Sequence, residues 1–126
     1  MIEKKATYSG VFGQVISNLR TAQGIEQEAM AEKMGISQAS YSRLENGKAT
    51  FSIDQMYQAS DALGLKVNDL IEKVDNYTSH LAQEGIKVES QVRGNATKPT
   101  QSNEVGDFIA GAALAAIVIG AIMSTK

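Results

Sequence analysis

The stretch SQASYSRLENG at 37–47 gathers amide, hydroxyl and guanidinium side chains that could read base pairs. Gln38 can form a bidentate pair with adenine, and Arg43 can reach a guanine or a backbone phosphate. Between them, Ala39 is small enough to touch a thymine methyl, and Ser40 can bond a base edge or a phosphate. These residue types at this spacing predict a surface that binds the major groove of double-stranded DNA.

A helix must hold these side chains, with its opposite face buried. Ser37 is suited to cap that helix, because its hydroxyl can accept a bond from an unpaired N–H of the first turn. Tyr41 and Leu44 fall on the other side and are expected to face the core. A second short helix precedes it and ends in a tight turn at Gly35. Two short helices joined in this way are typical of a helix-turn-helix, whose second helix enters the major groove.

The earlier helix starts at Gln27, whose amide is expected to hold a phosphate with help from the backbone N–H groups of that helix end. Glu26, Glu28 and Glu32 lie on the same helix. We expect them on a solvated face turned away from DNA, because phosphates would repel them.

Helical periodicity predicts five helices in residues 10–74, which makes the fold all-α. Apolar residues three and four positions apart mark the buried face of each helix. The predicted faces are Phe12, Ile16 and Leu19; Met30, Ala31 and Met34; Tyr41 and Leu44; Ile53, Met56, Tyr57 and Leu63, capped by Ser52; and the short fifth helix at 67–74.

Composition limits the chemistry available to the chain. There are no cysteines, a single histidine, His80, and no glycine-rich phosphate loop. This inventory predicts no enzyme activity, no metal site and no cofactor. The net charge of the 126 residues is −2, so a basic surface for DNA must be local.

Residues from Phe12 to about Lys73 resemble the phage lambda repressor and Cro (Xre-type) helix-turn-helix family. The resemblance rests on Ile16, Leu19, Arg20 and Gly24, on QEAMAEKMGIS, on SRLENGK and on ALGLKVNDL. It implies a five-helix bundle that dimerises on symmetric operators, with Glu45 in a structural pair, for example with Arg20. It also implies base contacts from the four residues named above. The implied contacts to the DNA backbone are Gln27, Ser37, Ser42, Asn46 and Lys48.

The flanking segments are less regular. Residues 1–9 are expected to be a flexible arm and residues 75–104 a stalk and polar linker. Val67, Val74, Leu81 and Val88 lie seven apart, which could extend the last helix to about residue 84 as a coiled-coil seam. Alternatively, IKVESQV alternates apolar and polar residues, which is a strand pattern.

Residues 105–123 are predicted to form a hydrophobic helix rich in small residues. The uncharged run 108–123 would span roughly 24 Å as a helix, somewhat short of a hydrocarbon core of ~30 Å. Its small residues recur four apart, a spacing that lets helices approach closely in lipid. The helix is therefore predicted to anchor the chain in a membrane or, alternatively, to assemble it in solution. The residues that define it are Phe108, Gly111, Ala112, Ala116 and Gly120.

Together these features predict a DNA-binding transcriptional regulator, most simply a repressor, that forms a homo-oligomer through its tail. Its head would be cytoplasmic, with the tail anchored in the inner membrane. A second interpretation is an antitoxin-like or adaptor protein that binds a partner protein through the head or the stalk. A third is a small membrane-active protein in which the tail is the effector.

Overall fold

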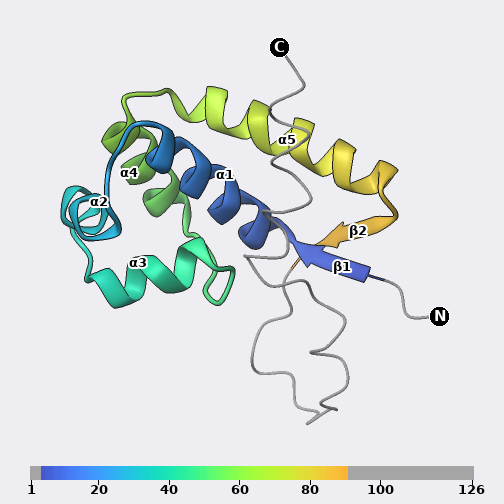
Figure 1. Ribbon diagram of the computed structural model, residues 1–126, viewed down its shortest axis with the longest axis horizontal. Helices are drawn as coiled ribbons and strands as arrows, with labels where there is room; N and C mark the ends of the chain where they lie inside the picture. Colours follow the sequence, from blue (N-terminus) through green and yellow to red (C-terminus); the bar gives the residue numbers. More distant parts are fainter. Residues whose placement is uncertain (1–3, 91–126) are drawn as a thin grey trace, which may run out of the picture.

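The computed structural model describes residues 4–90, which form five helices and a two-stranded sheet (Figure 1). The predicted helical bundle of five helices is confirmed for this part of the chain. The linker after residue 90 and the hydrophobic helix at 105–123 lie outside the described residues. The elements in chain order are β1 (Lys4–Thr7), α1 (Tyr8–Ala22), α2 (Gln27–Met34), α3 (Gln38–Glu45), α4 (Ile53–Leu63), α5 (Val67–Gln83) and β2 (Ile86–Glu89).

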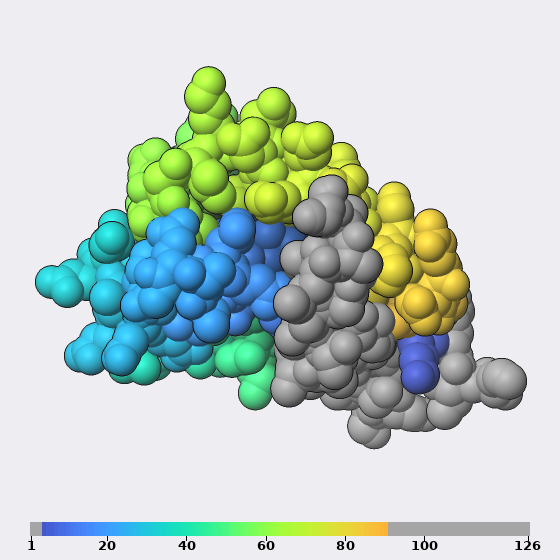
Figure 2. All heavy atoms as spheres, turned by 45° about the horizontal axis from the view of Figure 1, so that its top comes forward, coloured from blue at the N-terminus to red at the C-terminus, as the bar shows by residue number. Residues whose placement is uncertain are grey.

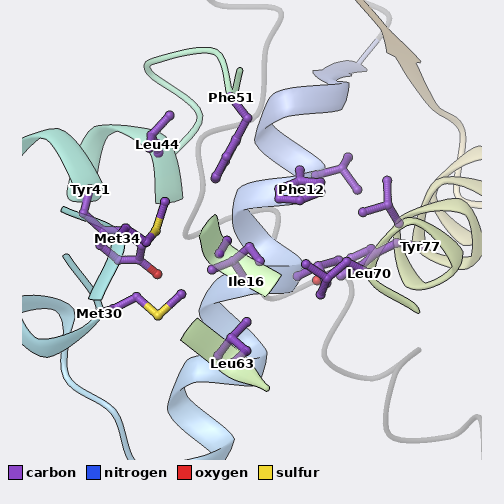
Figure 3. Close-up of a cluster of buried hydrophobic side chains, with 14 of the residues drawn as sticks. Phe12, Ile16, Met30, Met34, Tyr41, Leu44, Phe51, Leu63, Leu70 and Tyr77 are labelled. Atoms are coloured by element: carbon purple, nitrogen blue, oxygen red, sulfur yellow. The ribbon is translucent and has the colours of Figure 1, made fainter. Parts of the chain in front are cut away.

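Helix α1 runs through the middle of the molecule and contacts most of the other elements. Its residues Phe12 and Ile16 are buried, as the periodicity predicts, and Leu19 is partly buried against the core. Side chains from α2 and α3 cover one side of α1, and side chains from α5 cover the other (Figure 3). Burial of these apolar surfaces is the main favourable term that holds the helices together.

Gly13 allows α1 to lie directly against the end of α3. A Cβ built at this position would stand 2.4 Å from the carbonyl oxygen of Leu44 and 2.7 Å from that of Glu45. Both atoms belong to the backbone and cannot rotate away. Only a residue without a side chain fits here, so Gly13 sets the distance between α1 and α3.

The buried face of α4 differs from the predicted one. Ser52 caps the helix as expected and forms a capping box with Gln55. However, Ile53 and Tyr57 are 66% and 56% exposed. The small residues Ala59 and Ser60 occupy the buried stripe instead, together with Leu63 and the partly buried Met56. These small side chains let α4 approach its neighbours closely, and this turns Ile53 and Tyr57 outward.

Helix α5 continues to Gln83, close to the predicted limit, but it does not form a coiled-coil seam. Its buried residues are Leu70, Val74, Tyr77 and Leu81, spaced four, three and four apart. They pack against the same core as α1, within one chain. Residues 75–83 therefore extend the packed body, whereas the heptad spacing had suggested a stalk.

The end of the described chain returns to its beginning. β1 and β2 pair in parallel, with Lys4 opposite Ile86 and Thr7 opposite Glu89. Ala6 and Ile86 are both 2% exposed. The strand interpretation is thus confirmed for residues 86–89, and the expectation of a flexible arm is wrong for residues 4–7. Two short strands gain order here because each supplies the hydrogen-bond partners that the other lacks.

None of the helices within residues 4–90 is long and apolar enough to span a membrane. The sheet lies at one end of the body and α2 at the other, with α3 along one side (Figure 1). Helix α2 therefore lies at the end of the body opposite the sheet (Figure 1), whereas Gly47, just after α3, packs against Gly10 close to β1.

Candidate nucleic-acid interface

A tight turn joins α2 to α3, as the sequence predicts. Gly35 adopts the left-handed conformation, with φ of 75°, which glycine reaches without steric penalty. The backbone N–H groups of Gly35 and Ile36 donate to the carbonyls of Glu32 and Ala31 at 3.1 and 3.0 Å. Ser37 then caps α3, because its Oγ accepts a bond from the N–H of Ser40 at 3.1 Å. These bonds satisfy the backbone on both sides of the turn and hold α3 at a defined angle to α2.

Helix α3 separates its residues cleanly into two faces. Tyr41, Leu44 and Glu45 are buried beneath it. The outer stripe, which we define as Ala39, Ser42, Arg43 and Asn46, follows the spacing i, i+3, i+4, i+7, and all but the half-buried Ser42 are exposed. Gln38 is exposed at the first turn, beside this stripe. The structure therefore brings Gln38, Ala39 and Arg43 of the predicted base contacts onto one accessible surface.

Ser40 stands to one side of the outer stripe. Its hydroxyl lies 3.0 Å from the hydroxyl of the capping Ser37, so the two serines bond to each other at the helix start. Both remain exposed. This position suits contacts at the edge of the surface better than contacts at its centre.

The C-terminal end of α3 supplies further polar groups. The amide of Asn46 donates to the carbonyl of Ser42 at 2.9 Å and to its hydroxyl at 3.3 Å. A guanidinium nitrogen of Arg43 lies 3.5 Å from the carbonyl of Lys48, at the limit of a hydrogen bond. Lys48 itself is exposed. This contact brings the Arg43 guanidinium to the backbone of Lys48, an exposed cationic residue that follows α3.

Beneath the surface, a buried carboxylate joins three helices. Glu45 is 6% exposed and accepts bonds from Arg20 at 2.7 and 3.3 Å. It also accepts bonds from the Gln27 amide at 2.7 Å and from the Tyr41 hydroxyl at 2.6 Å. Burial and the neighbouring Glu45 carboxylate raise the pKa of Tyr41 well above its usual range. The predicted pairing of Glu45 with Arg20 is confirmed. The hydrogen bonds that Tyr41 and Gln27 donate to Glu45 were not predicted from the sequence.

The start of α2 is open. Its N-cap, Glu26, makes no side-chain hydrogen bond, in contrast to Ser37 on α3. Glu26, Glu28 and Glu32 are exposed and border a shallow hollow beside Ile25. In the space-filling view, side chains of α2 project from one edge of the molecule (Figure 2). The three glutamates are exposed to solvent, as predicted, and their orientation away from DNA stays a prediction.

Comparisons with known proteins agree with this geometry. Residues 16–70 match the helix-turn-helix family HTH_3. Over 62 residues, the chain is 31% identical to the SPbeta prophage-derived uncharacterized HTH-type transcriptional regulator YonR of Bacillus subtilis (strain 168). This alignment covers 49% of the present chain and 57% of YonR, so the chain spans little more than half the length of that relative.

Two solved structures share the fold at low sequence identity. The clp gene regulator ClgR from Corynebacterium glutamicum has a TM-score of 0.59 at 22% identity, over 61% of this chain and 82% of that one. An HTH_3 family transcriptional regulator from Vibrio cholerae has a TM-score of 0.50 at 19% identity, over 58% and 42% of the two chains. The match of residues 16–70 to HTH_3 confirms the resemblance of this region to lambda-repressor-like domains, and the two structures share its fold.

Proposed function

We propose, from the premise that residues 16–70 are a helix-turn-helix domain of the HTH_3 family, that the chain is a sequence-specific DNA-binding regulator of transcription. One observation carries the proposal: α3 presents an exposed polar stripe while its opposite face is buried. A helix of this kind fits the major groove, where each base pair offers a distinct pattern of donors and acceptors. Repression by occupancy of an operator is the simplest mode of action.

The proposed contacts follow from position on α3. Gln38, Ala39 and Arg43 would read base edges from the outer stripe and its N-terminal end, and Ser40 would contact a base or a phosphate at its border. Contacts to the DNA backbone fix orientation and carry little sequence information. In the proposal these come from Gln27, Ser37, Ser42, Asn46 and Lys48, which surround the reading residues.

The test begins with selection of an operator from a random double-stranded DNA library by the full chain. The double variant Gln38→Ala/Arg43→Ala should then lose roughly 1–3 kcal/mol of binding free energy for each lost contact. A matched control is Gln58→Ala/Lys66→Ala, which removes one exposed amide and one exposed cation on and after α4. Affinity measured by fluorescence anisotropy should fall only in the first variant. Equal affinity of both variants would refute the assignment of α3 as the reading helix.

Two copies of the helix-turn-helix domain would be needed to bind the two halves of a symmetric operator. We propose that the hydrophobic segment at 105–123, the tail, brings these copies together. The support is the sequence of residues 108–123, which holds sixteen uncharged residues, many of them small. Such a segment would be buried, against lipid or against other copies, because exposed apolar patches of this size aggregate. Linked heads would bind two half-sites at a raised effective concentration.

A charge in the middle of the tail tests this part of the proposal. Ala116→Lys should move the chain from the membrane fraction to the soluble fraction if the tail is an anchor in the inner membrane. If the tail is an assembly helix, the wild type is soluble and the same variant should dissociate in size-exclusion chromatography. Ser102→Lys adds the same charge to the polar linker and should change neither readout. A wild-type pattern for Ala116→Lys in both assays would show that the tail is not buried.

A further inference from the structure

The buried carboxylate of Glu45 has more donors around it than a simple ion pair requires. One oxygen accepts the Gln27 amide at 2.7 Å and a guanidinium nitrogen of Arg20 at 3.3 Å. The other accepts Nε of Arg20 at 2.7 Å and the Tyr41 hydroxyl at 2.6 Å. Another guanidinium nitrogen of Arg20 donates to the carbonyl of Ile25 at 2.7 Å. The four donors belong to three side chains, one each on α1, α2 and α3, so Glu45 links these three helices.

This arrangement fixes which way the Gln27 amide points. An ionised carboxylate only accepts hydrogen bonds, so the nitrogen of the amide, not its oxygen, must face Glu45. The amide nitrogen then uses one N–H for Glu45 and keeps a second. Gln27 is the first residue of α2, next to the end that no side chain caps. The side chain that carries the second N–H thus belongs to the first turn of α2, and backbone N–H groups at such a helix start attract anions.

We propose that Glu45 is a positioning residue for DNA binding, which acts through Gln27. It holds the Gln27 amide in the free protein in the orientation that a phosphate needs, so that little side-chain freedom is lost when DNA binds. This inference rests on the proposed function, because it assigns the target of the amide to DNA. It differs from a purely structural role for Glu45, which would support the fold without acting on one contact.

A double-mutant cycle on operator affinity separates the two roles. Gln27→Ala removes the phosphate contact and should weaken binding about ten-fold, as expected for a hydrogen bond to a charged group. Glu45→Gln leaves one acceptor oxygen, for which Arg20 competes, and should weaken binding by a similar factor. The double variant should bind no worse than Gln27→Ala alone. Multiplied losses in the double variant would overturn the proposal.

Tyr41→Phe is the matched control. It removes the bond to the Glu45 oxygen that does not face Gln27, and it leaves the bond from Gln27 intact. The variant should unfold at a lower temperature yet bind the operator as wild type does. A ten-fold loss of affinity in this variant would show that general weakening of the core, not orientation of Gln27, governs binding. All affinities are measured at a temperature at which circular dichroism shows each variant to be folded.

A measurement on the free wild-type chain keeps the inference testable if Glu45→Gln fails to fold. The side-chain amide of Gln27 should be rigid in NMR relaxation, with one proton protected from exchange. The exposed Gln58 amide serves as the mobile reference. A Gln27 amide as mobile as that of Gln58 would overturn the proposal. Failure to select any operator would instead refute the proposed function and would leave the NMR result intact.

Discussion

Gly13→Ala should destabilise the protein more than Gly10→Ala, the same substitution at the other glycine of α1. The new Cβ would stand 2.4 Å from the carbonyl oxygen of Leu44, where ordinary contact begins near 3.4 Å. The close-packed backbone cannot absorb this overlap, so α1 and the end of α3 must separate by about 1 Å. Overpacking of this kind costs about 1–3 kcal/mol of stability. The atoms that the new Cβ would meet belong to the α3 backbone and cannot move aside, so we expect a cost near the upper limit of that range.

Part of that loss is offset, because alanine is about 1 kcal/mol more favourable than glycine inside a helix. The expected net loss is therefore about 2 kcal/mol, which lowers Tm by about 8–16 °C in a domain of this size. Thermal unfolding of the full chain followed by circular dichroism at 222 nm measures it. Gly10→Ala is the control on the same helix, because its Cβ would meet only the Thr7 side chain at 3.0 Å and Gly47 at 3.9 Å. A Gly13→Ala variant as stable as wild type would refute the argument.

Three further perturbations address the remaining elements. Ser52→Ala removes the capping box of α4 and should lower stability by about 1 kcal/mol in chemical denaturation. Burial raises the pKa of Tyr41 and Tyr77 above the ordinary value of 10.0. Their contribution to stability is therefore complete below pH 10 and is lost as the pH rises toward the raised values. Tyr77→Phe should flatten the fall in the free energy of unfolding above pH 10, and an unchanged slope would contradict this. Ile86→Ala should cost about 2–5 kcal/mol because its side chain is buried, whereas the partly buried Val88→Ala should cost less; equal losses would mean that β2 does not pack as described.

Much of the fold could be predicted because the helix signals are local. Ser37 and Ser52 mark helix starts, because each serine accepts a hydrogen bond from a backbone N–H three residues later. Gly35 marks a helix end, because glycine readily adopts the left-handed backbone conformation found there. Met30 and Leu44 fall on buried faces at helical spacing. These signals require no knowledge of what lies across the core, so the sequence alone is sufficient.

The features that escaped prediction depend on partners far along the chain. Residues 4–7 look like an arm because nothing nearby shows that β2 will supply hydrogen bonds to them. Val74 and Leu81 of the predicted heptad are buried, but in the core of the same chain rather than against a second helix, and Val88 belongs to β2. Ile53 is apolar and correctly spaced, yet its side chain is 66% exposed, because the packing of α4 buries a different stripe of that helix.

The candidate nucleic-acid interface also has features that could be predicted from local sequence and features that could not. The exposure of Gln38 and Arg43 follows from the burial of Tyr41 and Leu44 on the same helix, so it could be predicted. The bond between Gln27 and Glu45 could not, since it depends on how α2 crosses α3. Sequence spacing identifies which side chains share a helix face, and tertiary packing decides which of them are already engaged.

The pairing of β1 with β2 also sets an order of events during synthesis. The two strands are separated by about 80 residues, the longest closure within the described chain, and the entropy lost on closing such a loop slows its formation. At roughly 5–20 residues per second, a ribosome needs on the order of ten seconds to deliver β2 after β1 has emerged. The early helices have local contacts and can form within that interval, while Lys4–Thr7 wait unpaired. Helices α2 and α3 of a nascent chain would therefore be assembled before β1 and β2 are joined.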